Sequence, residues 1–279
     1  MITTKITRYQ LNALIIKRLM SSQTVAKRAE SESMRSQELK TTTLPNGLVV
    51  TSIENQSPIT RIGVIVKAGS RYEPINELGL THTLRSMSGF TTKESTVFGI
   101  TRNIEYVGGS LSAITSRDLM IYLLENDRNY TETTLKYLSD TVMRPAFKPW
   151  QIKDNLYRQK ADLALFKDNP QLVLMEALNS VAFRGGLRNS IYSPEFMLGK
   201  HSSEMLSNFV EQHFVSNRTA IVGTGIEHNR LLEQVDKYFS MARGDRGQTG
   251  ESKFIGGQTR IDSNLDNTYV AVATEGVGY

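Results

Sequence analysis

The chain of 279 residues contains no cysteine. This absence excludes a disulfide scaffold, a zinc site built from thiolates and a cysteine nucleophile. Long apolar runs are missing as well: the sequence has no stretch of about 18 uncharged apolar residues, the length that a membrane-spanning helix needs. The hydrophobic fraction of 39% still suffices for the core of one large domain or two small ones.

Acidic residues are absent from the N-terminal stretch, since the first of them is Glu30. The residues before it include six basic ones: Lys5, Arg8, Lys17, Arg18, Lys27 and Arg28. A basic, hydroxyl-rich and acid-free N-terminus is typical of a mitochondrial presequence. We therefore predict a presequence over residues 1–20, with cleavage before Ser21, and a flexible spacer over 21–40. A disordered basic tail is the alternative.

The net positive charge of the chain comes from this N-terminal stretch. The formal net charge is +5, from 33 basic and 28 acidic residues. Without the six basic residues before Glu30, 27 basic residues stand against 28 acidic ones, a balance of −1. The remainder therefore lacks the basic surface of one sign that nucleic acids require, and we expect no nucleic-acid binding.

Patterns after residue 40 predict short strands and runs of helices. Pro45-Asn46-Gly47 between two β-prone runs indicates a hairpin. The predicted strands cover 41–44, 48–53, 61–67, 110–115, 120–124 and 219–222. The predicted helices cover 78–87, 97–107, 130–143, 149–167, 170–182, 203–214 and 229–239. Because strands and helices do not alternate strictly, we predict an α+β fold, an antiparallel or mixed sheet covered by helices, rather than a doubly wound parallel sheet.

The same patterns predict a domain boundary near the C-terminal end. We expect an N-terminal α+β domain over 41–241 and a glycine-containing linker over 242–259. Residues 269–274 then have the alternating pattern of a new strand. Its partner strand would lie in sequence that the chain does not contain, so we expect 260–279 to be the start of a second domain.

Histidine is scarce: the chain has only His82, His201, His213 and His228. No two of them are three or four residues apart, the spacing that places two imidazoles on one helical face for a zinc ion. We expect each to occupy a solvated or helix-capping position. Gly223-Thr224-Gly225 lacks the third glycine of a dinucleotide-binding loop and is predicted to be a tight strand-to-helix turn.

Several motifs resemble those of the pitrilysin-type inverzincin peptidases. They are Leu44-Pro45-Asn46-Gly47-Leu48, Arg61-Ile62-Gly63, Ala68-Gly69-Ser70-Arg71-Tyr72-Glu73 and the segment 104–117 around Gly108-Gly109. The segment 79–86 falls where these enzymes carry their H-x-x-E-H motif. The resemblance covers about residues 39–275. It implies one half of a fold made of two similar α+β halves joined by a linker, with only the start of the second half.

The resemblance also implies where a metal site would lie. An active inverzincin binds zinc through two histidines and a distal glutamate, and a glutamate between the histidines is the general base. Here His82 is at the first histidine position, Arg85 at the base position, Ser86 at the second histidine position and Asp162 at the distal position. An arginine cannot accept a proton from water, and a serine hydroxyl is a poor ligand. We therefore expect a degenerate site, without zinc and without hydrolysis.

Within this family, the runs 67–73, 79–85 and 107–112 resemble the non-catalytic core subunits of mitochondrial respiratory complex III more than active peptidases. This resemblance implies a structural subunit on the matrix side of the inner membrane, peripheral to it, without a transmembrane helix and without a cofactor of its own. The implied partners are the first core protein, cytochrome b and other subunits of the complex. The alternative is the non-catalytic, alpha-type partner subunit of the mitochondrial processing peptidase, which also lacks the zinc motif.

Overall fold

The computed structural model describes residues 38–244, 252–263 and 266–276. Leu39–Tyr279 forms one compact unit of the chain. The predicted presequence over 1–20 and nearly all of the predicted spacer over 21–40 lie outside the described residues. In the described part, no helix is both long and apolar enough to cross a membrane.

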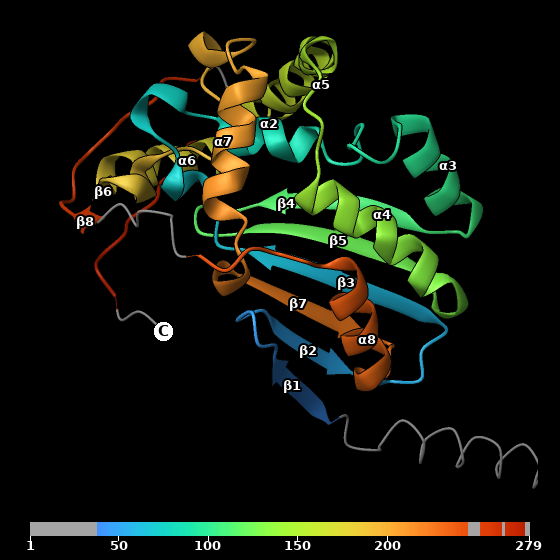
Figure 1. The fold of residues 1–279 in the computed structure, drawn as a ribbon. Coiled ribbons are helices and arrows are strands. Elements are labelled where there is room, and N and C mark those ends of the chain that lie inside the picture. Colours follow the sequence, from blue (N-terminus) through green and yellow to red (C-terminus); the bar gives the residue numbers. More distant parts are fainter. Residues whose placement is uncertain (1–37, 245–251, 264–265, 277–279) are drawn as a thin grey trace, which may run out of the picture. The chain divides into compact units, whose positions relative to one another are not determined.

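A six-stranded mixed sheet forms the centre of this unit, with the strand order β1-β2-β7-β3-β5-β4 (Figure 1). The strands are β1 Leu39–Thr43, β2 Val49–Ile53, β3 Ile59–Val66, β4 Ser110–Thr115, β5 Met120–Asp127, β6 Phe183–Arg184, β7 Thr219–Thr224 and β8 Lys253–Phe254. The helices are α2 Leu80–Ser86, α3 Val97–Tyr106, α4 Thr131–Met143, α5 Pro149–Lys167, α6 Pro170–Ala182, α7 Ser203–His213 and α8 His228–Tyr238. The predicted fold class, an α+β fold with a mixed sheet covered by helices, is confirmed.

Local sequence explains where these elements begin and turn. The predicted hairpin is confirmed: β1 and β2 are antiparallel, and Gly47 has a φ of 89°, a left-handed conformation that favours glycine. Pro149 and Pro170 occupy the first turns of α5 and α6, where a missing N–H costs nothing. The side chain of Asn169 caps α6 by accepting a hydrogen bond from the backbone N–H of Leu172.

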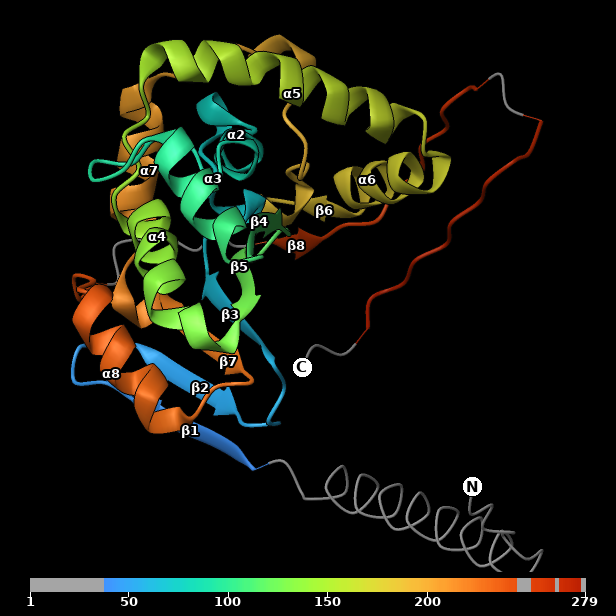
Figure 2. The same cartoon turned by 90° about the vertical axis from the view of Figure 1, so that its right-hand side faces the viewer.

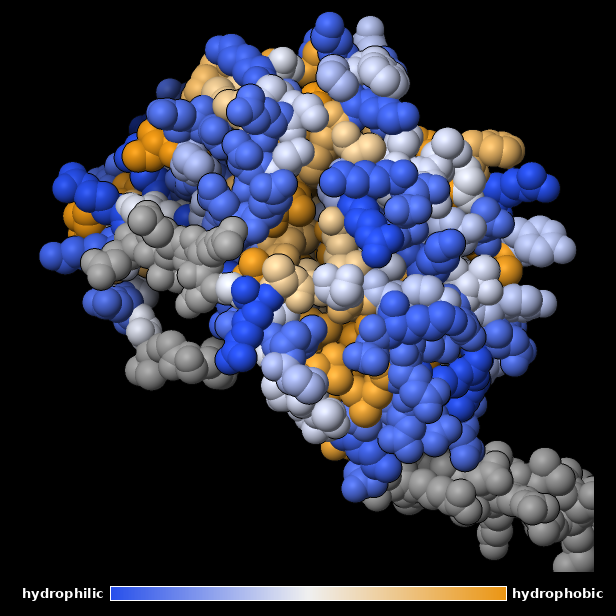
Figure 3. All heavy atoms as spheres, in the orientation of Figure 1, coloured by the Kyte–Doolittle hydropathy of each residue, from blue (hydrophilic) through white to orange (hydrophobic). Residues whose placement is uncertain are grey.

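The core lies between the sheet and the helices packed on one of its faces. Along β5, Met120, Tyr122 and Leu124 are buried, whereas Ile121 and Leu123 between them are half-buried, the alternation of a strand with one covered face. Helices α4 and α8 cover that face, and α5 and α6 lie farther from the sheet (Figures 1 and 2). Figure 3 shows a mostly hydrophilic surface, with hydrophobic residues in the crevices between elements and some at the surface.

The structure agrees with the predicted helices within two residues and with the predicted strands of the main sheet within three. The predicted strand over 269–274 is wrong, because no strand is found in the described residues 266–276. A strand is held by hydrogen bonds to a neighbouring strand, and among the described residues none pairs with this segment.

A short strand lies inside the predicted linker of 242–259. Strand β8 pairs antiparallel with β6, and the rings of Phe254 and Phe183 pack at a centroid distance of 5.7 Å. Two-residue strands carry no readable periodicity, so the sequence gives no signal for this pair. The domain boundaries themselves stay predictions.

Candidate functional site

Helix α2 carries three of the four positions of the predicted degenerate site, and a buried carboxylate caps its N-terminus. Glu73 accepts hydrogen bonds from the backbone N–H groups of Gly79 and Thr81, each at 2.8 Å, and from the Thr81 hydroxyl at 2.6 Å. These bonds satisfy N–H groups that a helix start leaves without partners. Burial raises the pKa of Glu73 to about 7 despite these donors. Gly79 has a φ of 87°, and a Cβ there would overlap Ser193.

His82 is fully buried and both of its ring nitrogens have partners. Nδ1 lies 3.3 Å from the backbone nitrogen of Ser193, which donates to it, so Nε2 carries the proton and faces Asp162 Oδ2 at 3.3 Å. Burial, and next the charge of Arg85, lower the pKa of His82 to about 4. The imidazole is therefore neutral at neutral pH, and its contact with the carboxylate is a hydrogen bond rather than an ion pair.

Arg85 connects α2 to α5 through the same carboxylate. Its guanidinium donates to Asp162 Oδ2 at 2.7 Å and lies over the ring of Tyr192 at 5.5 Å from the centroid. Tyr192 in turn stacks on Phe166 at 4.4 Å and contacts His82 edge-on at 5.6 Å. The cation thus sits between a carboxylate and an aromatic ring, held in place from both sides.

Ser86 is turned toward the backbone of its own helix. Its hydroxyl donates to the carbonyl oxygen of His82 at 2.7 Å and accepts from the side-chain amide of Asn155 at 3.2 Å. The other amide atom, Asn155 Oδ1, is buried without a hydrogen-bond partner. All four predicted positions are therefore brought together where α2 packs against α5.

The expectation that the histidines are solvated or cap helices is wrong for most of them. His82, His201 and His213 are buried, and burial lowers the pKa of each. A neutral imidazole tolerates burial when its nitrogens are bonded, as in His201, which accepts from the Thr83 hydroxyl at 2.8 Å and faces a backbone carbonyl with its other nitrogen. The remaining one, His228, is half-buried in the first position of α8.

Some residues of this cluster were not singled out from the sequence. Asn155 and Gln159 lie at helical spacing with Asp162 along α5, and this polar stripe in a helix is a signal that could have found them. Gln159 donates to the Thr83 hydroxyl at 2.7 Å. Tyr192 had no such signal, because it lies in a loop without periodicity.

The cluster borders an open cleft of about 740 Å³, lined by residues of α2, β4 and α5 and by Tyr192. Within the ranges that the structure describes, no group of three or more histidine, cysteine, aspartate or glutamate side chains could hold a metal ion. The polar side chains of the cluster are instead bonded to one another or to the backbone.

Known proteins resemble this chain in sequence and in fold. The model of the family described as insulinase (peptidase family M16) matches residues 48–195. Cytochrome b-c1 complex subunit 2 of Rattus norvegicus is 41% identical over 243 residues, which cover 87% of this chain and 54% of that protein. The probable mitochondrial-processing peptidase subunit alpha-2 of Arabidopsis thaliana is 33% identical over 250 residues, 89% of this chain and 50% of that protein.

A solved structure, that of a protease from Helicobacter pylori, has a TM-score of 0.67 at 17% identity and covers 76% of this chain and 52% of that chain. At this identity the likeness concerns the fold. The predicted resemblance to the second core protein, subunit 2 of complex III, is confirmed by the rat relative. This chain spans about half the length of the relatives it matches. Because the family model matches more than half of its residues, the chain belongs to the insulinase-type peptidase family M16.

Proposed function

We propose that this chain is a non-catalytic structural core subunit of mitochondrial respiratory complex III, supporting the assembly and stability of the ubiquinol–cytochrome c reductase. The observation that carries the non-catalytic part of the proposal is the ion pair of Arg85 with Asp162 at the position where the family's zinc peptidases bind their metal. The 41% identity to subunit 2 of the rat cytochrome b-c1 complex supports it.

The residues at the four positions do not fit a zinc ion. A catalytic zinc site needs three protein ligands and an open fourth position. His82 Nε2 carries a proton, Asp162 Oδ2 accepts from two donors, and the Ser86 hydroxyl donates to a backbone carbonyl. The positive charge of the Arg85 guanidinium would also repel a divalent cation bound by these residues.

The same residues supply no general base for hydrolysis. Arg85 replaces the glutamate that would take a proton from water, and a guanidinium is permanently protonated in proteins. His82 is neutral, but its unprotonated nitrogen faces the backbone N–H of Ser193 rather than the cleft. We propose on these grounds that the cluster is structural and holds α2 against α5.

The proposed location and partners follow from the relatives' names and from the N-terminal composition. The rat relative is named as mitochondrial and as a subunit of the cytochrome b-c1 complex. Together with the basic, acid-free stretch before Glu30, this supports import into mitochondria and a place on the matrix side of the inner membrane. The proposed partners are the first core protein, cytochrome b and other subunits of the complex.

The alternative function is that of the alpha-type partner of the mitochondrial processing peptidase. The 33% identity to the Arabidopsis alpha-2 subunit supports this alternative, and it is lower than the identity to the rat complex III subunit. Both functions are non-catalytic for this chain, so the Arg85–Asp162 pair does not distinguish them.

Affinity purification of the tagged full chain from its own mitochondria, under mild detergent, tests the proposal. We expect cytochrome b and the first core protein to be recovered with it. Recovery of presequence-cleaving activity with a zinc-containing partner, and no cytochrome b, would favour the alternative. Metal analysis of the purified chain provides a second test: stoichiometric zinc that disappears in a His82→Ala variant would contradict the non-catalytic reading.

A further inference from the structure

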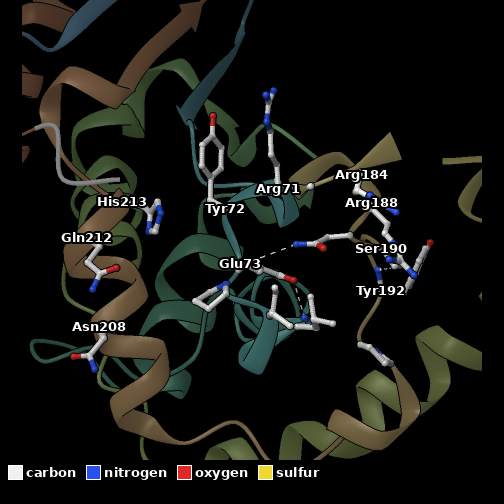
Figure 4. A pocket seen from close by; sticks show the side chains of 18 of the residues that line it. Arg71, Tyr72, Glu73, Arg184, Arg188, Ser190, Tyr192, Asn208, Gln212 and His213 are labelled. Atoms are coloured by element: carbon white, nitrogen blue, oxygen red, sulfur yellow. Dashed lines mark hydrogen bonds between the residues drawn. The ribbon is translucent and has the colours of Figure 1, made fainter. Parts of the chain in front are cut away.

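A second and larger cavity lies at the N-terminal end of α2, and Tyr192 lines both this cavity and the cleft beside the Arg85–Asp162 cluster. The volume of this second cavity is about 1310 Å³. One wall is α7, with Asn208, Gln212 and His213, and the opposite wall is the segment Arg184–Tyr192, as Figure 4 shows. This cavity is called the α7 pocket below. No step of the proposed function uses it.

The segment that forms the arginine-bearing wall is anchored at several points. Arg117 donates to the carbonyl oxygen of Leu187 at 3.2 Å, and the Asn189 side chain donates to the carbonyl of Ser70 at 2.9 Å. The backbone N–H of Leu187 also donates to the Ser252 hydroxyl at 3.0 Å. A Cβ at Gly186 would overlap the backbone of Arg71, so the two segments are in close contact. The wall is therefore held in place before any ligand binds.

Arg184 and Arg188 belong to this anchored wall and line the pocket, and within the described part of the chain neither side chain makes a hydrogen bond or an ion pair. Arg71, on the same side of the pocket, is paired with Asp118 at 3.0 Å. Two acidic residues also line the pocket: the carboxylate of Glu73 is bonded to the start of α2, and Glu211 belongs to α7 on the opposite wall. Two guanidiniums on a fixed support thus line the pocket without a counter-charge on their own wall, against the single exposed carboxylate of Glu211 on the α7 wall.

The rest of the lining is suited to a polypeptide. The rim and floor include Ile75, which is 86% exposed, together with Leu78 and Tyr72. The amides of Asn208 and Gln212 on α7 can both donate and accept hydrogen bonds, as a peptide backbone requires. The volume exceeds the roughly 300–1,000 Å³ of typical small-molecule pockets.

We propose that the α7 pocket binds an acidic peptide segment of a partner protein. The carboxylates of the segment pair with Arg184 and Arg188, because planar guanidiniums match carboxylates with two parallel hydrogen bonds. An apolar side chain of the segment packs on Ile75 and Leu78 at the rim. Because the supporting wall is already anchored, the pocket itself loses little conformational entropy when the segment binds.

Fluorescence anisotropy with a labelled peptide in which glutamate and leucine alternate tests this proposal on the full chain. We expect saturable binding that weakens with salt, and no binding of matched peptides in which glutamine or lysine replaces glutamate. The Arg184→Glu/Arg188→Glu double variant should weaken binding by about tenfold or more, the equivalent of about 1.4 kcal/mol. Ile75→Ser should weaken it by a smaller factor.

The matched control is Arg102→Glu/Lys160→Glu, which changes the net charge by the same four units, because these residues are exposed on α3 and α5 and are likewise without an ion pair among the described residues. If the control loses as much affinity for the peptide as the pocket variant, the loss is due to the net charge of the chain and not to the pocket, and the proposal is overturned. Equal affinity for the glutamine peptide would overturn it as well. Displacement of the peptide by inorganic phosphate at matched ionic strength would assign the pocket to small anions instead. Thermal melts of each variant verify that the fold is retained.

Discussion

Arg85 on α2 donates a 2.7 Å hydrogen bond to the same oxygen of Asp162 on α5 that faces the imidazole of His82. One guanidinium therefore supplies positive charge to the carboxylate at the position of the family's distal metal ligand. Unlike a metal ion, it does so through a covalently attached side chain that also stacks on Tyr192. The positive charge at this site is therefore supplied by a side chain of the protein, Arg85.

Replacing Arg85 by alanine should lower the free energy of unfolding by about 1–2 kcal/mol, because Asp162 loses its charged donor while only 36% exposed. Urea unfolding at neutral pH measures the effect. The control is Arg61→Ala, whose pair with Glu125 is 59% exposed on the arginine side and should be worth less than about 1 kcal/mol. Equal losses in the two variants would mean that the Arg85 pair has no special structural role.

The stability of the chain should depend on the protonation of His82 between about pH 4 and 6.5. Its pKa is about 4 in the folded chain, whereas the ordinary pKa of a histidine is 6.5, so the unfolded chain binds the proton more tightly. The stability present above pH 6.5 is therefore lost as the pH falls, by about 1.4 kcal/mol per pH unit at most. The difference in the free energy of unfolding between the wild type and His82→Gln should therefore become smaller as the pH falls from 6.5 to 4.

The carboxyl group of Glu73 acts in the opposite direction and partly hides this effect in the wild type. Its pKa is raised from 4.5 to about 7, so its contribution is present below pH 4.5 and lost as the pH rises toward 7. For this reason the His82 prediction is tested as a difference between two proteins. A difference in unfolding free energy between the wild type and His82→Gln that stays constant between pH 4 and 6.5 would contradict a lowered pKa of His82.

Rebuilding the family's ligand set should create zinc binding. The variant Arg85→Glu/Ser86→His/Asp162→Glu removes the cation and restores two histidines four residues apart on one helical face. Metal analysis after dialysis should find zinc in this variant and none in the wild type. Adding His82→Ala to the triple variant should abolish the binding. Zinc retained without His82 would show that the metal lies elsewhere.

Gly79→Ala should destabilise the chain more than Gly108→Ala. Both glycines have a positive φ, 87° and 67°, so both substitutions carry the backbone cost of about 1–2 kcal/mol. A Cβ at Gly79 would in addition overlap Ser193, whereas nothing lies within 4 Å of one at Gly108. Chemical denaturation of the two variants compares these costs. Equal losses of unfolding free energy in the two variants would indicate that the loop around Ser193 moves aside without destabilising the chain.

Much of the fold was predictable because its signals are local. The Pro45-Asn46-Gly47 turn, the helix starts at Pro149 and Pro170 and the alternation along β5 each act within one turn or one strand. The failed strand over 269–274 has the right alternation, but a strand also needs a partner, and periodicity alone cannot supply one.

The sequence by itself determined which residue types stand at the four site positions and therefore that an arginine and a serine replace a base and a ligand. Only the tertiary structure decided what these residues do. Arg85 and Asp162 are 77 positions apart, and their bond exists because α2 packs against α5. Likewise, Arg184 and Arg188 line the same cavity as α7 only because the chain folds back on itself. Such contacts depend on long-range packing, to which local propensity and spacing do not respond.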